Sequence, residues 1–270
     1  SAIPAFSRGG LMPAKQERGR FVWYDLMTKD PAAAADFYTK LIGWSTQPWE
    51  GSKPYTMWVN GETPLGGVVQ QPDDAGAPPH WMSYIATPDV DATAEQAKEL
   101  GGSVVHGPDD IPSVGRFAVI SDPQGAMFAA FTSATDSPER EGPAQLGEVS
   151  WHELATTDHE AAFEFYRSLF GWETKETMDM GEMGTYHMYG TSGEKAPLGG
   201  MFNKPPEMPA PGWLYYIKVK DVNGAVETVK ELGGKVLNGP MEVPGGSGDM
   251  IAQCVDPQGA AFALHSAAQS

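Results

Sequence analysis

The sequence predicts an α+β fold made of four β-α-β-β-β modules, joined as two pairs along the chain. Two observations carry this prediction. Residues 23–44 align without a gap with residues 151–172, and both segments share Trp, Leu, Asp, Phe-Tyr, Leu and Gly-Trp at matching positions. Inside each half, strand patterns and one helical pattern follow each other in the same order twice. The chain therefore repeats at two levels.

The first module begins with an aromatic and apolar strand at residues 21–27. Asp30 follows as a helix N-cap, and Pro31 takes the first helical position, where its missing N–H is tolerated. Gly43 ends the helix. One face of this helix is apolar at helical spacing, with Ala34, Phe37, Tyr38 and Leu41. Three strands are expected next, from Trp44 onward, at 55–59 and at 65–70.

The second module repeats this order after a polar segment at residues 71–79. A strand at 81–86 precedes a helix that Asp89 caps. The apolar face of this helix is predicted to consist of Val90, Ala94, Ala97 and Leu100. Strands are expected at 103–106, 117–121 and 127–132. Matching helices follow Asp158 and Asp221, so the second half should fold like the first.

The length of 270 residues fits two domains. We expect them at residues 20–133 and 147–266, because residues 134–146 have the composition of a linker. Residues 1–19 lack a continuous apolar stretch, so no secretory signal is expected. We interpret residues 1–19 as a leader or tail that is partly vector-derived.

The net charge of −17 excludes some partners. Such a surface repels phosphate backbones and anionic lipids, so we expect no nucleic acid and no membrane as partner. Cys254 is the only cysteine, which rules out an internal disulfide and a thiolate metal cluster. This pattern favours a cytoplasmic protein.

Three groups of motifs resemble the glyoxalase/bleomycin-resistance/extradiol dioxygenase superfamily, also called vicinal oxygen chelate proteins. They are DPAAAADFYTKLIGW and DHEAAFEFYRSLFGW, PDVDATAEQAKELGG and KDVNGAVETVKELGG, and DPQGAMFAAF and DPQGAAFALH. The chain looks most like a tandem-domain bacterial branch whose members are often described as glyoxalase-family proteins or hydroxylases. The resemblance implies that each pair of modules forms an eight-stranded cup around a small-molecule site.

The resemblance also implies positions for metal ligands, and this sequence departs from the family pattern there. The side chains at these positions are Trp23, Met82 and Ala129 in the first half, and Trp151, Leu214 and Ala263 in the second. None offers the imidazole, carboxylate or thiolate that a divalent cation prefers. We therefore expect no metal site and no cofactor, and metal-dependent chemistry does not carry over.

Alternation along the strands predicts which other side chains face the cups. Trp23 and Asp25 should share a face with Met82 and Tyr84. In the second half, the matching set is Trp151, Glu153, Leu214 and Tyr216. We also expect Tyr55 and Tyr186 near the cup mouths, and His265 near the rim of the second cup. Each cup should thus combine apolar walls with one carboxylate, the usual composition of a small-molecule site.

Three functions remain open at this point. The first is a binding protein of the bleomycin-resistance type, which sequesters a small, partly aromatic molecule without metal. The second is a metal-independent lyase, isomerase or hydrolase that uses Asp25 and Glu153 as acid or base. The third is glyoxalase or dioxygenase chemistry with unusual metal ligands. The expected assembly is a monomer with a pseudo-twofold axis, or a homodimer.

Overall fold

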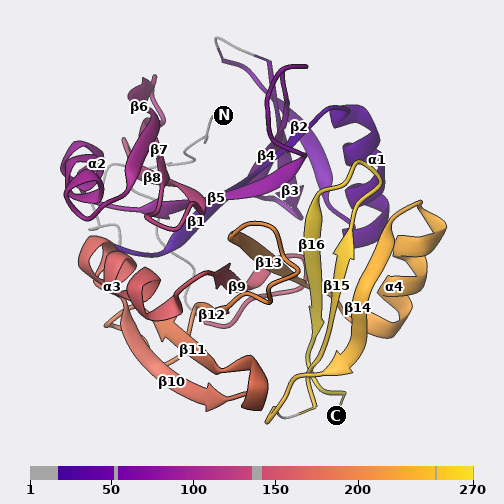
Figure 1. Ribbon diagram of the computed structural model, residues 1–270. Coiled ribbons are helices and arrows are strands. Elements are labelled where there is room, and N and C mark those ends of the chain that lie inside the picture. The colour runs from indigo at the N-terminus through magenta and orange to yellow at the C-terminus, as the bar shows by residue number, and fades with distance from the viewer. Residues whose placement is uncertain (1–17, 52–53, 136–141, 247, 270) are drawn as a thin grey trace.

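The computed structural model describes residues 18–51, 54–135, 142–246 and 248–269 (Figure 1). The first half contains eight strands and two helices in the predicted order. Its elements are β1 (Phe21–Thr28), α1 (Pro31–Ile42), β2 (Ser45–Trp49), β3 (Tyr55–Asn60), β4 (Thr63–Gln70), β5 (His80–Ala86), α2 (Val90–Glu99), β6 (Ser103–Ile111), β7 (Gly115–Ser121) and β8 (Met127–Ser133).

The second half repeats this order and adds one 3₁₀ turn. Its elements are β9 (Val149–Thr156), α3 (His159–Phe170), β10 (Glu173–Asp179), η1 (Gly181–Met183), β11 (Thr185–Gly190), β12 (Gly199–Asn203), β13 (Gly212–Lys218), α4 (Val222–Glu231), β14 (Lys235–Glu242), β15 (Met250–Val255) and β16 (Ala261–Ser266). All these elements lie inside the two expected domains. The helices that the structure describes include none that is long and apolar enough to cross a membrane.

Each half forms one eight-stranded mixed sheet, which confirms the predicted fold class. The strand orders are β2-β3-β4-β1-β5-β8-β7-β6 and β10-β11-β12-β9-β13-β16-β15-β14. Within a module, the first strand pairs in parallel with the last, as β1 does with β4. The first strands of two modules pair antiparallel, as β1 does with β5. The two modules of a sheet are thus related by a local pseudo-twofold axis between their first strands.

The helix signals of the sequence are confirmed. The Asp30 carboxylate accepts a hydrogen bond from the Ala33 N–H at 3.0 Å, and Gly43 closes α1 with φ of 91°. Asp89, Asp158 and Asp221 cap the other three helices in the same way. The predicted apolar face of α2 was wrong at its last position, because α2 ends at Glu99 and the Leu100 side chain is 37% exposed.

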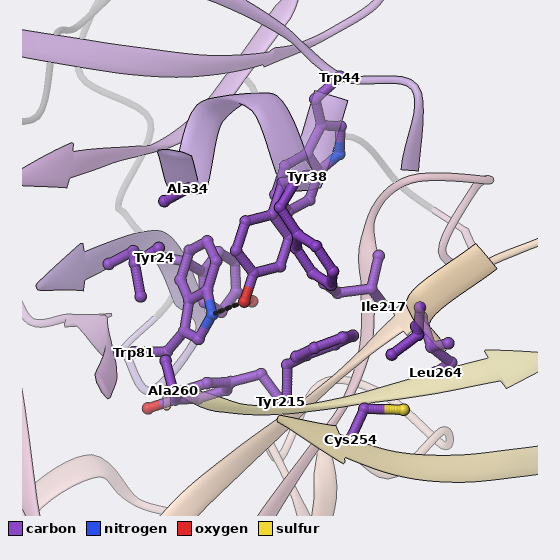
Figure 2. Close-up of a cluster of buried hydrophobic side chains, with 14 of the residues drawn as sticks. Tyr24, Ala34, Tyr38, Trp44, Trp81, Tyr215, Ile217, Cys254, Ala260 and Leu264 are labelled. Atoms are coloured by element: carbon purple, nitrogen blue, oxygen red, sulfur yellow. Dashed lines mark hydrogen bonds between the residues drawn. The ribbon is translucent and has the colours of Figure 1, made fainter. Parts of the chain in front are cut away.

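The helices of the two halves pack against each other in two pairs. Figure 1 shows α1 beside α4 and α2 beside α3, and both pairs are in contact. One shared core joins the first module to the last module, and a second joins the two middle modules. In the first core, Tyr38, Trp44 and Trp81 face side chains of the other half, among them Tyr215, Ile217, Cys254 and Leu264 (Figure 2).

Two pairs of reciprocal hydrogen bonds cross between the halves. The Tyr38 hydroxyl donates to the Asp256 carboxylate at 2.8 Å, and the Tyr166 hydroxyl donates to Asp122 at 2.7 Å. Both carboxylates belong to the Asp-Pro-Gln-Gly turns that the sequence repeats. The indoles of Trp44 and Trp172 likewise donate to backbone carbonyls across the interface, at 2.9 and 2.8 Å. The repeated Phe-Tyr and Gly-Trp motifs therefore hold the two halves together.

The segments predicted as leader and linker are only partly described. Residues 1–17 and 136–141 lie outside the described residues. Arg18, which was assigned to the leader, donates from its guanidinium to the Leu169 carbonyl at 3.0 Å. The carbonyl of Gly19 accepts the Trp172 indole N–H. Arg18 and Gly19 are therefore part of the packed structure.

Candidate functional site

The inner face of the first sheet carries a closed network around Asp25. The Asp25 carboxylate accepts hydrogen bonds from the hydroxyls of Tyr55, at 2.5 Å, and Tyr84, at 2.7 Å. The Trp23 indole donates to the Tyr55 hydroxyl at 2.8 Å and to Asp25 at 3.2 Å. Asp25 is completely buried. The structure therefore joins Trp23, Asp25 and Tyr84, which alternation had placed in this cup, with Tyr55, which was expected near its mouth.

The first cup is filled by its own side chains. Met82 and Phe117 are buried there together with Trp23, Tyr55 and Tyr84. The rest of this buried cluster consists of Met57, Val59, Ile111, Val114, Ala129 and Phe131. Close packing of these side chains excludes water from the Asp25 carboxylate. Its hydrogen bonds therefore come from tyrosine and tryptophan donors.

The second sheet carries the same network around Glu153. The Tyr186 hydroxyl donates to Glu153 at 2.7 Å, and the Tyr216 hydroxyl donates to it at 3.1 Å. The Trp151 indole donates to Tyr186 at 2.8 Å, and the Gln253 amide donates to Tyr216 at 3.1 Å. Glu153 and Trp151 are only half-buried here. The same constellation is thus enclosed in one half and accessible in the other.

A cavity of about 1280 Å³ extends from the second cup to the first strand of the other half. Trp151, Glu153, Tyr186, Tyr216 and His265 line it, as the sequence had predicted for the second cup. Residues 20–24 and 63–65, together with Phe131 and Ser133, border it from the first half. Its apolar lining includes five methionines, Met178, Met180, Met183, Met188 and Met241. Thioether side chains adapt their shape and contact aromatic rings well, so this wall suits a flat apolar ligand.

Leu214 differs from the other residues predicted for the second cup. Its backbone pairs with Glu153 in the sheet, and its side chain is half-buried. It is not among the side chains that line the described cavity. The ligand-binding role predicted for Leu214 therefore remains a prediction, and so does that of the buried Met82 in the first cup. Neither side chain lines the cavity.

Burial controls the ionisation of both carboxylates. Removal from water raises the pKa of Asp25 above its ordinary value, and the hydrogen bonds from Tyr55, Tyr84 and Trp23 oppose part of that rise. Burial also raises the pKa of Glu153, against the hydrogen bonds from Tyr186 and Tyr216. A raised pKa makes a carboxyl group a stronger base than an ordinary one, which suits proton transfer. Glu153 combines that property with access to the cavity.

The edge of the second cup holds polar side chains where the first cup has apolar ones. The Ser150 hydroxyl lies 2.9 Å from the His265 Nδ1, and the His265 Nε2 lies 2.8 Å from the Asp249 carboxylate. All three side chains line the cavity. From the strand registers, the first half has Val22, Gly115 and Phe131 at the corresponding places.

Sequence reasoning identified His265 but missed Ser150 and Asp249. A register shift in β9 interrupts the alternation between Trp151 and Val149 and places Ser150 at the bulge. Simple alternation would assign Ser150 to the opposite face from Trp151. A position-by-position comparison of the halves supplies the missing signal, because Val22, Gly115 and Phe131 all differ in kind from their counterparts.

The positions that the family uses for metal ligands do not fit a divalent cation in this chain. In the first half they are occupied by Trp23, Met82 and Ala129, all of which belong to the buried apolar cluster. The second half has Trp151, Leu214 and Ala263 there. Among the described residues, no cluster of three or more His, Cys, Asp or Glu side chains is placed to hold a metal ion.

We expect unequal effects when the two carboxylates are replaced by amides. Asp25→Asn should lower the free energy of unfolding by about 1–3 kcal/mol, because an amide N–H would face buried hydroxyl and indole donors. Glu153→Gln should lower it less, since this side chain borders the cavity. Urea unfolding of both variants beside the wild type measures the difference. Equal losses would contradict the contrast between an enclosed and an accessible network.

These features define a two-domain protein of paired β-α-β-β-β modules with a large cavity that extends from the second domain to the first. The chain belongs to the Glyoxalase/Bleomycin resistance protein/Dioxygenase superfamily, whose family model matches residues 20–130 and again residues 147–264. The match covers both halves. It confirms the family and the tandem architecture inferred from the repeated motifs.

Two relatives from Streptomyces match nearly the whole chain. The anthracycline biosynthesis protein DauV of Streptomyces sp. (strain C5) is 32% identical over 267 residues, covering 91% of this chain and 92% of that protein. The anthracycline biosynthesis protein DnrV of Streptomyces peucetius is 31% identical over 268 residues, with the same coverage of both chains.

Solved structures show the same fold at lower identity. The Mn(II)-bound glyoxalase from Novosphingobium aromaticivorans superimposes with a TM-score of 0.66 at 15% identity, covering 93% of this chain and 82% of that one. The 2,3-dioxygenase LapB from Pseudomonas sp. KL28 has a TM-score of 0.66 at 11% identity, covering 94% of both chains. At such identities these likenesses concern the fold alone.

Proposed function

We propose that the second cup binds a small, flat and partly aromatic molecule, while the first cup is a structural counterpart. One observation carries this proposal. The same Trp-Tyr-carboxylate-Tyr network is packed shut in the first half and borders a cavity of about 1280 Å³ in the second. The network residues at equivalent positions of the repeat thus pack against other side chains in the first half. In the second half they remain available to a ligand.

The lining of the cavity supports this class of ligand. Trp151, Tyr186, Tyr216 and Phe202 offer aromatic surfaces, and the methionines offer polarisable apolar contacts. Glu153 and Gln253 add polar atoms at one wall. Apolar walls with a few placed polar groups are typical of small-molecule sites. A planar molecule that carries hydroxyl or carbonyl groups could satisfy both kinds of surface.

The names of the Streptomyces relatives point in the same direction. Both are called anthracycline biosynthesis proteins. Anthracyclines are fused-ring aromatic compounds that carry hydroxyl and carbonyl groups. We therefore propose a hydroxylated aromatic compound of this general kind as the ligand.

Ile251→Phe is expected to abolish ligand binding. Ile251 lines the cavity, and the corresponding residue of the first half is Phe117, which helps to fill that cup. In the wild type, a ligand at a hundredfold excess over its Kd should stabilise the fold by about 2.7 kcal/mol. Thermal unfolding with a panel of hydroxylated polycyclic aromatics measures this shift, which the variant should lose.

Phe117→Ile is the matched control for this experiment. It changes the first cup in the opposite sense, so it should lower stability by about 1 kcal/mol and keep the ligand-induced shift. If no panel member stabilises the wild type, or if Ile251→Phe binds as the wild type does, the proposed site is wrong.

A second candidate function is metal-independent catalysis with Glu153 as acid or base. The observation in its favour is the raised pKa of a carboxyl group that faces the cavity. Asp25, the other predicted acid-base residue, is enclosed by its own cup. Loss of turnover in Glu153→Gln with intact ligand binding would support this function over binding alone.

A further inference from the structure

Ser150, His265 and Asp249 form a continuous hydrogen-bonded chain at the edge of the cavity. The Ser150 Oγ lies 2.9 Å from Nδ1 of His265, and Nε2 of the same ring lies 2.8 Å from Oδ2 of Asp249. Serine and histidine are partly buried, with 19% of the histidine side chain exposed. The second carboxylate oxygen of Asp249 accepts the Ala268 N–H at 3.0 Å.

The direction of these hydrogen bonds follows from the chemistry of the three groups. A carboxylate only accepts, so Asp249 holds a proton on Nε2 of His265. The neutral ring then presents Nδ1 as an acceptor. The Ser150 Oγ lies 2.9 Å from Nδ1 and 3.3 Å from the Tyr216 carbonyl, so its single proton can be donated to either acceptor, and the ring nitrogen is the nearer one. A serine, a histidine that accepts its proton and a carboxylate that orients the ring are the three roles of a nucleophilic triad.

The backbone places Ser150 where a nucleophile is needed. The register between β9 and β13 shifts at this residue, and such bulges re-aim a side chain. Ser150 consequently lines the cavity together with its neighbour Trp151. The first half has a register shift at the corresponding point, where Val22 stands. The bulge is therefore shared, and the reactive group occurs only in the open cup.

All three polar residues are absent from the closed cup. Val22, Phe131 and Gly115 occupy the positions of Ser150, His265 and Asp249. Phe131 belongs to the buried cluster that fills the first cup. A Cβ atom on Gly115 would lie 2.6 Å from the Phe131 ring, so the closed cup has no room for a side chain there. Val22 and Phe131 border the same cavity from the first half, so the cavity has apolar groups there and the polar constellation on the side of the second half.

We propose that Ser150 is a nucleophile that cleaves a carboxylic ester of the aromatic ligand. This inference rests on the proposed function, because the cavity must first bind the aromatic part of the substrate. Gln253 and Asn238 line the same cavity and carry amide donors suited to an ester carbonyl. The ester group is expected at the edge formed by Ser150, with the aromatic part against the methionines.

The reaction is a two-step acyl transfer to water. The Ser150 oxygen attacks the ester carbonyl carbon while its proton moves to Nδ1 of His265, and the bond to the alcohol then breaks as that proton passes to the leaving oxygen. Water attacks the acyl-serine in the second step, again giving its proton to His265. The carboxylic acid leaves, and Ser150 recovers its proton. No oxidation or reduction takes place.

Covalent labelling of the full-length protein tests this inference. The probe is phenylmethanesulfonyl fluoride, whose sulfonyl group a nucleophilic serine captures with loss of fluoride. We expect one added phenylmethanesulfonyl group by intact mass, located on Ser150 by peptide mapping. Ser150→Ala should abolish the labelling. His265→Gln should slow it about 100-fold, the scale of general-base catalysis, and Asp249→Asn should slow it as well.

Two further measurements make the outcome decisive. The variant His265→Phe places at this position the residue type that the first half carries there. Thermal unfolding of each variant shows whether it folds. Hydrolysis of p-nitrophenyl acetate should decline in the same order as the labelling. Ser83 is an internal control, since its hydroxyl is buried and accepts from Tyr215 at 2.8 Å. Labelling of Ser150 that depends on His265 and Asp249 supports the triad.

Absence of labelling, labelling elsewhere, or labelling that persists unchanged in His265→Gln overturns the triad. The proposed binding function fails separately, when no aromatic compound stabilises the wild-type protein. A protein that binds the aromatic panel and leaves Ser150 unlabelled would therefore refute the nucleophile and leave the binding function standing.

Discussion

Replacement of Tyr166 by alanine is expected to lower the free energy of unfolding by about 3–5 kcal/mol. Its side chain is fully buried between the halves. The ring stacks on Trp172 with centroids 5.2 Å apart and contacts Phe128 at 5.4 Å. The alanine variant loses these contacts and leaves a cavity. It also removes the hydroxyl that donates to the buried Asp122.

Tyr166→Phe isolates the contribution of the hydroxyl. The ring contacts remain, and Asp122 keeps the backbone N–H donors of its own turn. We therefore expect a smaller loss of about 1–3 kcal/mol. Tyr38→Phe is the matched variant in the other half. Its loss should be at least as large, because the Tyr38 hydroxyl also accepts the Trp81 indole N–H at 3.1 Å.

Urea unfolding, followed by tryptophan fluorescence and far-ultraviolet circular dichroism, measures these differences. The two signals should change together, since the mutated contacts join the halves and couple their unfolding. Wild-type stability in Tyr166→Ala would show that the interface contributes nothing to the fold. Separate transitions for the two signals would contradict the coupling.

Acidification from pH 7 to pH 4 is expected to remove about 3 kcal/mol of stability through His152 alone. Burial lowers the pKa of His152 from 6.5 to about 4, although its hydrogen bond to the Leu198 carbonyl opposes the change. The unfolded chain binds a proton at this residue as the pH falls through 6.5, and the folded chain does so only near pH 4. Between these values falling pH favours the unfolded state.

The surroundings of His152 explain why the folded state keeps it neutral. Its Nδ1 lies 2.9 Å from the Leu198 carbonyl, and its Nε2 lies 2.5 Å from the Tyr24 hydroxyl. The ring stacks on Phe21 with centroids 3.8 Å apart. The neutral ring donates to the carbonyl and accepts from the tyrosine, whereas a second proton would place a positive charge in a site removed from water.

The double variant Tyr24→Phe, His152→Phe tests this account. Replacing both partners by apolar rings should change the stability little at pH 7.5, and the loss between pH 7 and pH 4 should become about 3 kcal/mol smaller. Urea midpoints measured at several pH values for both proteins give the comparison. If the stability of both proteins fell equally between pH 7 and pH 4, His152 would not account for this loss. The buried carboxyls Asp25, Asp122 and Glu153 remain in both proteins, so their contributions cancel.

Most of the fold follows from local signals in the sequence. Asp30 and Gly43 mark the ends of a helix through their capping chemistry, and Phe37 and Tyr38 mark its buried face. Each signal depends on neighbours within a few residues, so it can be read without tertiary structure. The repeated motifs then extend the same conclusion to the other modules.

The site was predictable only where strand alternation is regular. Trp23, Asp25 and Tyr84 share a face as expected, and so do Trp151, Glu153 and Tyr216. The register shift at Ser150 breaks the alternation. Whether a cup is open depends on volumes contributed by residues such as Phe117 and Phe131, which meet Tyr84 only in the folded chain. Nothing local to those residues signals that they close a cup.

The reciprocal bonds of Tyr38 and Tyr166 have a consequence for the history of the chain. Each half supplies the tyrosine that the turn of the other half accepts, so the contact has the form of a symmetric dimer interface within one polypeptide. A gene duplication that fused two such subunits would leave the interface intact and make one cup redundant. Under the function proposed above, the first cup would then have exchanged a ligand for packing side chains and would serve to support its partner.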